Sequence, residues 1–208
     1  MHEEIWYAAY GTNLARARLD CYLAGGIPPG AALATPGARD PSPPRAVRPL
    51  RLTGEVLFGW ESPTWGGGVA FYDPAGPGTV AARGYLLTRG QLSDVAAQEM
   101  HRAPGADLDL DALLLSGTHV FGAGRYETMH VVGDVDGAPV VTFTASWGDG
   151  SPTYTAPSAA YLLTMGGGLR EAHGWDAERT AAYLLARPGI GSTWTTASVR
   201  ALLDGDAG

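Results

Sequence analysis

The chain has 208 residues, of which 45% are hydrophobic and 17% are charged, and its formal net charge is −7. This length and apolar content are enough for a substantial core, so we expect residues 1–208 to form a single domain. The excess of acidic residues argues against a nucleic-acid partner, because proteins that bind nucleic acids usually carry a basic surface.

The N-terminal residues Met1-His2-Glu3-Glu4 are acidic and lead directly into an apolar segment. They lack the basic region and the long apolar run of a signal peptide. No stretch of the sequence approaches the ~20 apolar residues of a membrane span. The single cysteine, Cys21, cannot form an internal disulfide, which fits a reducing compartment. We therefore expect a cytoplasmic protein with no membrane partner, and we leave its oligomeric state open, a homodimer included.

The N-terminal part of the chain predicts a strand, a helix and a long loop. Residues 5–9 predict a buried strand, and residues 14–24 predict a helix that stops at Gly25-Gly26. The segment 28–49 holds seven prolines and three arginines, which excludes a regular helix or a central strand. We expect an ordered surface loop there. A lid or a substrate-contacting insert is the alternative, because loops longer than ~12–15 residues are often functional or disordered.

The middle of the chain is rich in predicted strands. The strand segments are apolar runs, mostly bounded by glycine or proline: 55–60, 68–72, 80–87, 129–135 and 139–145. Between the last two lies Asp136-Gly137, a strong signal for a two-residue hairpin. Helical spacing of apolar residues predicts a helix over 91–102. Residues 107–115 fit either a helix start or a loop.

The C-terminal quarter predicts helices from about residue 158. Three helix-starting signals occur there: Pro157-Ser158, Asp176 and Thr196. The first helix is expected to reach about His173, and the second to end near Pro188-Gly189. Gly166-Gly167-Gly168 lies inside the first helix, where each glycine costs ~1 kcal/mol relative to alanine. Close approach of another backbone is the expected reason, and a break in the helix is the alternative.

The run Tyr10-Gly11-Thr12-Asn13-Leu14 lies at the predicted strand-to-helix corner, and Asn13 is the only asparagine in the chain. A helix N-terminus after a glycine turn offers backbone N–H groups and a helix dipole that favour an anion. Gly11 permits a positive φ and close approach of a ligand. Thr12 and Asn13 can cap the helix or bind the ligand, and Tyr10 can form a wall. Simple helix capping explains the same residues equally well.

Other reaction types find little support in the sequence. The five histidines, at positions 2, 101, 119, 130 and 173, lack metal-ligand spacing, so we do not expect a zinc-dependent deacetylase or protease. Asp107, Asp109 and Asp111 start like a calcium loop that lacks its glycine and its closing glutamate. Cys21 lies within a predicted helix and is expected to be a packed thiol. We therefore predict no metal and no cofactor.

The order Trp-Tyr-x-x-Tyr-Gly-Thr-Asn-Leu resembles the Tyr-Gly-Ser-Asn-Leu signature of the γ-glutamylcyclotransferase-like family. Further segments resemble the family in the same order: Gly67-Gly68-Val69-Ala70, residues 80–87 with 92–99, Arg125-Tyr126, and the C-terminal helix with its glycines. The resemblance implies an α+β fold, a small mixed, partly closed β-barrel with peripheral helices. Thr12 replaces the usual serine, Met100 follows Glu99 where the best-known members have glycine, and the proline-rich segment is long. These departures leave the substrate open.

The resemblance also implies a reaction on a small γ-glutamyl molecule. The substrate's α-amino group attacks its own γ-carbonyl, which releases an amine and forms 5-oxoproline. Such an attack needs no protein nucleophile and no metal, and correct orientation alone can contribute ~7–11 kcal/mol. A single carboxylate of raised pKa can serve as base and then as acid. Glu99 is the candidate, although a glutamate on a helix is usually a solvated surface residue.

The predicted substrate-binding residues are Tyr10, Gly11, Thr12, Asn13, Leu14, Tyr126 and Tyr161. The two later tyrosines are equally well explained as half-buried packing residues. Two other functions remain open. One is a non-catalytic module that binds γ-glutamyl compounds or carboxylates, and the other is acyl transfer or amide hydrolysis on the same fold.

Overall fold

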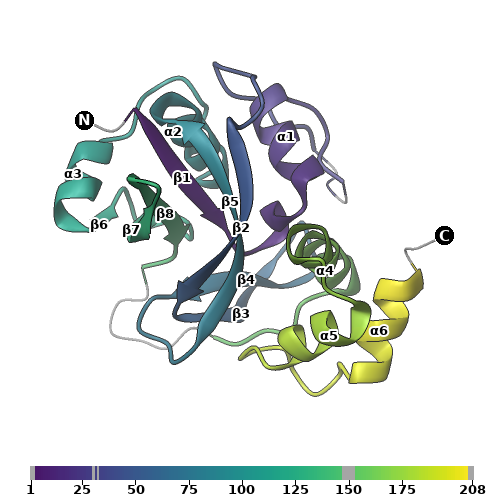
Figure 1. Cartoon of the computed structure of the whole chain (residues 1–208). Coiled ribbons are helices and arrows are strands. Elements are labelled where there is room, and N and C mark those ends of the chain that lie inside the picture. The colour runs from purple at the N-terminus through teal and green to yellow at the C-terminus, as the bar shows by residue number, and fades with distance from the viewer. Residues whose placement is uncertain (1–2, 30, 32, 147–152, 206–208) are drawn as a thin grey trace.

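The computed structural model describes residues 3–29, 31, 33–146 and 153–205 (Figure 1). The strands are β1 (Glu4–Ala9), β2 (Ala46–Thr53), β3 (Glu55–Ser62), β4 (Gly67–Asp73), β5 (Thr79–Thr88), β6 (Thr118–Val120), β7 (Thr128–Val135) and β8 (Ala138–Thr144). The α-helices are α1 (Arg16–Ala24), α2 (Arg89–Glu99), α3 (Leu110–Ser116), α4 (Ala159–His173), α5 (Ala177–Leu185) and α6 (Thr196–Gly205), and a short 3-10 helix, η1 (Thr12–Leu14), follows β1. The predicted α+β class is confirmed.

Six strands form one mixed sheet in the order β2-β5-β1-β8-β7-β6. Strand β1 runs antiparallel to β5 and parallel to β8. Strands β3 and β4 form a separate antiparallel pair. The sheet is not closed, which corrects the predicted partly closed barrel: β2 and β6 are its two edges. The three-residue β6 and the proline in β2 make poor partners for a further strand, because short strands and prolines limit pairing at an edge.

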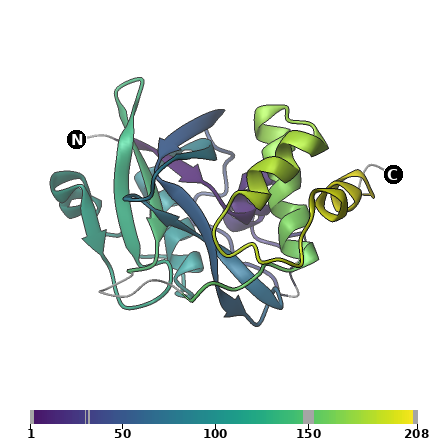
Figure 2. The same cartoon turned by 90° about the horizontal axis from the view of Figure 1, so that it is seen from below.

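Helices cover both faces of the large sheet. Successive side chains of β1 point to opposite faces: Ile5 and Tyr7 pack with residues of α1, α2 and α3, whereas Trp6 and Ala8 pack with residues of β3, β4 and α4 to α6. Figure 2 shows the three C-terminal helices together on one side of the molecule. Burial on both faces explains why the sequence of β1 is apolar throughout rather than alternating.

The hairpin between β7 and β8 turns at the predicted dipeptide. Asp136 and Gly137 both have positive φ, 54° and 79°, as a two-residue turn of this kind requires. The ambiguous segment 107–115 contains a helix, α3, whose first turn is capped by the Asp109 side chain. No helix among the described residues is long and apolar enough to cross a membrane.

The proline-rich segment ends earlier than predicted, because residues 46–49 belong to β2. Within the described residues, strand β2 pairs only with β5 and forms an edge of the sheet, where Pro49 is tolerated since an edge strand needs a ladder on one side only. The first helix also begins later than predicted, at Arg16, because residues 12–14 form η1.

Helix α4 begins after Ser158, whose hydroxyl accepts a hydrogen bond from the Tyr161 amide, and runs unbroken to His173 as predicted. A Cβ at Gly168 would overlap the backbone of Leu14 and Ala15, and one at Gly166 would meet the Leu203 side chain at 2.5 Å. The expected close approach is therefore confirmed: Gly168 lets α4 pack directly against η1.

Candidate active site

The corner after β1 is shaped by η1 rather than by a capped α-helix. The Leu14 amide donates to the Gly11 carbonyl at 3.0 Å, and the Ala15 amide donates to the Thr12 carbonyl at 3.1 Å. Gly11 has a φ of −102°, so the expected positive φ is wrong. Its lack of a side chain matters for space instead, since a Cβ there would lie 3.2 Å from the Tyr161 hydroxyl oxygen.

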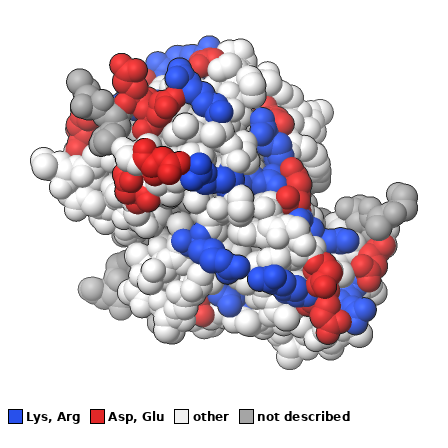
Figure 3. All heavy atoms as spheres, viewed as in Figure 1, with Lys and Arg blue, Asp and Glu red and all other residues white. Residues whose placement is uncertain are grey.

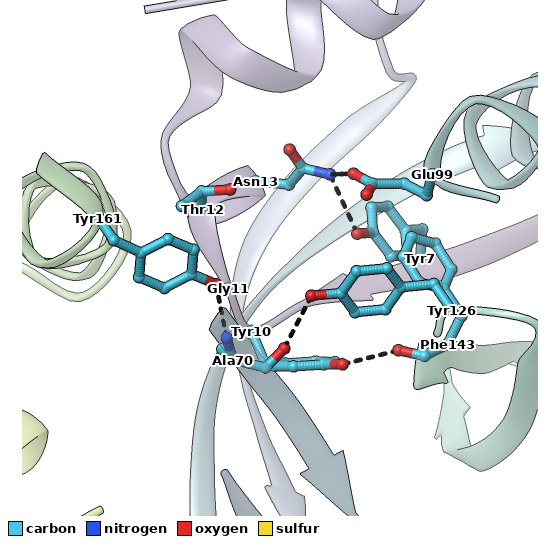
Figure 4. Close-up of a pocket in the computed structure, with 10 residues that line it drawn as sticks. All are labelled: Tyr7, Tyr10, Gly11, Thr12, Asn13, Ala70, Glu99, Tyr126, Phe143 and Tyr161. Atoms are coloured by element: carbon cyan, nitrogen blue, oxygen red, sulfur yellow. Dashed lines mark hydrogen bonds between the residues drawn. The ribbon is translucent and has the colours of Figure 1, made fainter. Parts of the chain in front are cut away.

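Asn13 connects this corner to Glu99. The Asn13 Nδ2 donates to the Glu99 Oε1 at 2.7 Å, across 86 positions of sequence, and also to the Tyr7 hydroxyl at 3.4 Å (Figure 4). Neither η1 nor α1 has a side-chain cap. Asn13 therefore serves the carboxylate and not the helix terminus.

Glu99 is the last residue of α2, a helix fixed at its start by a reciprocal pair of hydrogen bonds between Thr88 and Gln91. Burial raises the pKa of the Glu99 carboxyl, while the Asn13 hydrogen bond, the Arg18 charge and a hydrogen bond from Tyr22 lower it, with a net rise. The C-terminal end of a helix carries partial negative charge, which acts in the same direction as burial. A carboxyl in this position can exchange a proton closer to neutral pH than an exposed glutamate.

The corner and Glu99 share one small cavity of about 40 Å³. Ten residues line it: Tyr7, Tyr10, Gly11, Thr12, Asn13, Ala70, Glu99, Tyr126, Phe143 and Tyr161. Figure 4 shows the tyrosine rings and the Asn13–Glu99 pair converging from separate elements. Six of the seven predicted binding residues and the predicted catalytic residue therefore lie together.

The exception is Leu14. Its side chain is fully buried in the core beneath the corner and is not among the residues that line the cavity. Sequence reasoning also missed three lining residues, Tyr7, Ala70 and Phe143. Tyr7 and Ala70 stand within the motifs that carried the family resemblance, which is the signal that could have identified them.

Tyr126 and Tyr161 form hydrogen bonds with the backbone of Ala70 rather than with Glu99. The Tyr126 hydroxyl donates to the Ala70 carbonyl at 3.0 Å, and the Ala70 amide donates to the Tyr161 hydroxyl oxygen at 2.8 Å. Burial raises the pKa of both phenols, so each hydroxyl keeps its proton. Because Tyr161 accepts from Ala70, its own O–H remains a donor that can face a ligand.

A larger groove of about 770 Å³ adjoins the cavity and shares with it Thr12, Glu99, Tyr126 and Tyr161. Its walls include Trp60 and Trp65, and from the first part of the proline-rich segment they include Pro28, Ala31 and residues 33–36. These residues therefore line the groove, and the substrate-contacting alternative for this segment stays a prediction. Glu99 lies where cavity and groove meet.

Solved structures share this fold. A gamma-glutamyl cyclotransferase gives a TM-score of 0.53 at 16% sequence identity, covering 98% of this chain and 99% of that chain. An uncharacterized protein from Homo sapiens gives 0.52 at 16% identity with the same coverage. No model of a known protein family matches the chain. The likenesses confirm the predicted γ-glutamylcyclotransferase-like fold, and at this level of identity they show the fold alone.

One curated relative is similar in sequence. The chain is 29% identical over 203 residues to histone deacetylase 5 of Arabidopsis thaliana. The alignment covers 87% of this chain and 30% of that protein. The chain thus spans less than a third of the relative's length. Among the residues that the structure describes, no group of three or more His, Cys, Asp or Glu side chains is arranged to hold a metal ion.

Proposed function

We propose that the chain is a γ-glutamylcyclotransferase-like enzyme that converts a γ-glutamyl amine or amide to 5-oxoproline and a free amine. The observation that carries this proposal is the hydrogen bond from Asn13 to Glu99 inside a tyrosine-lined cavity. The motif and the carboxylate that the chemistry needs are thereby joined in one site. The chain also shares its fold with a solved gamma-glutamyl cyclotransferase, so the fold is one that can carry this site.

In this proposal the cavity binds one part of the substrate and the groove binds the other. The glutamyl part enters the cavity, where the backbone at Gly11 to Asn13 binds its α-carboxylate or its carbonyl oxygen. The leaving amine extends past Glu99 into the groove. Folding the substrate back on itself brings the α-nitrogen to the γ-carbonyl, and this orientation supplies much of the rate enhancement.

Glu99 acts twice in the reaction. Its carboxylate first takes a proton from the substrate's α-ammonium group, and the freed nitrogen attacks the γ-carbonyl carbon. The new C–N bond closes the ring, and the negative oxygen that forms is stabilised by hydrogen-bond donors of the cavity, such as the Tyr161 hydroxyl. The bond to the leaving nitrogen then breaks as Glu99 returns its proton to that nitrogen. The ring nitrogen gives its second proton to the released amine, which leaves as an ammonium ion, so that the neutral lactam remains and Glu99 is again a carboxylate. No water molecule is consumed.

Replacement of the carboxylate tests this mechanism. Glu99→Gln retains an oxygen that can accept from Asn13 but cannot take up a proton, so 5-oxoproline formation should fall by at least ~10²–10⁴-fold. Binding of a γ-glutamyl compound, measured by calorimetry, should persist. Glu3→Gln, an exposed glutamate outside the cavity and the groove, is the matched control. Turnover retained by Glu99→Gln would contradict the proposal.

The products separate cyclisation from the other two functions. In water enriched in heavy oxygen, cyclisation gives 5-oxoproline without the label, whereas hydrolysis gives glutamate that carries it. A binding module would show thermal stabilisation by γ-glutamyl compounds and no product of either kind.

A further inference from the structure

The groove beside Glu99 contains a buried arginine whose charge has no carboxylate partner among the described residues. Arg18 of α1 is only 5% exposed, yet it lines the groove. Its Nη1 donates to the Pro29 carbonyl at 2.9 Å, and its guanidinium lies 4.9 Å from the centre of the Trp65 ring. Its Nε has no hydrogen-bond partner within the described part of the chain.

A buried guanidinium is costly unless a negative group compensates it. The other fully buried arginine of the described chain, Arg83, follows that rule, because its Nη1 lies 2.9 Å from a carboxylate oxygen of Glu171. For Arg18 the structure offers the Trp65 ring, the Pro29 carbonyl and the Tyr22 hydroxyl, none of which carries a formal charge. An anion is therefore the missing partner.

Glu99 cannot be that permanent partner in the proposed reaction. The charge of Arg18 lowers the pKa of the Glu99 carboxyl, and Tyr22 is hydrogen-bonded to both side chains. However, Glu99 is neutral during part of each catalytic cycle. The guanidinium needs a second negative group while Glu99 carries the proton, and the substrate is the group that arrives and leaves with each cycle.

The remaining arginines of the groove fit this role less well. Arg102 is already paired with Glu127 at 2.8 Å. Arg125 lies against the Trp60 ring on the wall that the groove shares with another cavity, and the leading causes that set the pKa of Glu99 include the charge of Arg18 but not that of Arg125. Arg18 is thus the cation that is both buried and electrostatically close to the reacting carboxyl.

We propose that Arg18 is a specificity-determining residue that binds an anionic group, such as a carboxylate, on the amine half of the substrate. Nη1 is held by Pro29 and the guanidinium lies over Trp65, so Nε, which has no partner in the described part of the chain, is the donor left for the anion, and a carboxylate can bind an arginine through two parallel N–H groups. The inference rests on the proposed function, and it selects γ-glutamyl compounds with an anionic amine half over those with a neutral one.

The test compares γ-glutamyl-alanine with its neutral analogue γ-glutamyl-alaninamide, which differ only in that anionic group. Binding is measured by calorimetry in a Glu99→Gln background, so that no turnover interferes. A charged hydrogen bond of this kind corresponds to about tenfold or more in affinity. We expect γ-glutamyl-alanine to bind at least about tenfold more tightly, and Arg18→Met to remove most of that ratio. Arg45→Met, the same change of charge at an exposed pair with Glu4, should leave the ratio unchanged.

Arg18→Lys provides a second variant that keeps the charge and removes the planar fork, and it should retain part of the ratio. Equal binding of the two ligands by the parent protein would overturn the role of Arg18 while leaving the proposed function intact. The same conclusion follows if Arg125→Met abolishes the ratio and Arg18→Met does not. If neither ligand binds, the proposed function fails, and the inference fails with it.

Discussion

At the scale of single residues, Asn13 does a different task from the one its position suggests. A lone asparagine at a helix start is usually a cap, but here its amide donates to Glu99 and Tyr7. This hydrogen bond favours the charged carboxylate, while burial favours the neutral acid. These two opposite effects on the pKa of Glu99 matter, because a residue that takes a proton and later returns it must be able to exist both as the carboxylate and as the neutral acid.

Asn13→Ala should therefore raise the pKa of Glu99 further. Removal of a donor to the carboxylate leaves burial less opposed, so a larger share of Glu99 is protonated at neutral pH and cannot act as the base. The acidic limb of kcat/KM should move to higher pH, read from a pH–rate profile. His101 also lies close enough to lower the pKa of Glu99, so the shift should persist in an Asn13→Ala, His101→Gln double variant. An unmoved acidic limb would show that Asn13 does not tune the carboxyl.

At the scale of elements, the corner depends on how closely α4 approaches η1. The contact places the Tyr161 hydroxyl next to Gly11 and beside Ala70. Gly166, Gly167 and Gly168 have equal helix propensity, but among the described residues the first and third face another element and the second does not. The first and third glycines thus allow close packing of α4 against neighbouring elements, whereas the middle glycine only lowers the stability of the helix.

Two alanine substitutions separate these effects. Gly168→Ala forces a methyl group into the Leu14 and Ala15 backbone, and such overpacking typically costs ~1–3 kcal/mol. It should lower the urea midpoint and weaken γ-glutamyl binding by shifting the corner. Gly167→Ala meets nothing within 4 Å and should raise the midpoint, since alanine is favoured in a helix by up to ~1 kcal/mol. Equal effects of the two changes would refute the role assigned to Gly168.

Whether an element could be predicted from the sequence depends on whether its own residues or its contacts with distant elements determine its structure. The hairpin at Asp136-Gly137 was predictable because a two-residue turn is encoded by its own residues. Strand β2 was not, because its extended form comes from pairing with β5 and no local periodicity marks it. In the site, the corner was identified by its motif and Glu99 by resemblance. Phe143 was missed because only the pairing of β8 with β1 brings it near the corner.

At the scale of the whole molecule, the site exists only when distant elements have assembled. Tyr7 lies on β1, Ala70 on β4, Glu99 on α2, Phe143 on β8 and Tyr161 on α4. Basic and acidic side chains are interspersed over the face shown in Figure 3, so no broad field of one sign dominates that face. The raised pKa of Glu99 is a consequence of local burial. Burying the ionised carboxylate costs free energy, and this cost lowers the stability of the folded protein.

This linkage predicts how the stability of Glu99→Gln differs from that of the parent. The folded-state pKa of Glu99 lies above its usual value of 4.5, so between those two values the native state binds more protons than the unfolded state. The parent's free energy of unfolding therefore decreases as pH rises through that window and then levels off. Gln does not ionise, so the variant avoids this loss.

In urea denaturation, Glu99→Gln should be more stable than the parent at neutral and mildly alkaline pH. The gap should shrink as pH falls through the raised pKa and reach its minimum below about 4.5, where the parent carboxyl is protonated in both states. Glu3→Gln, at an exposed position, should show no such pH-dependent gap. A gap that widens on acidification would mean that the folded protein favours the carboxylate, and Glu99 would then be a poor candidate for returning a proton to the leaving amine.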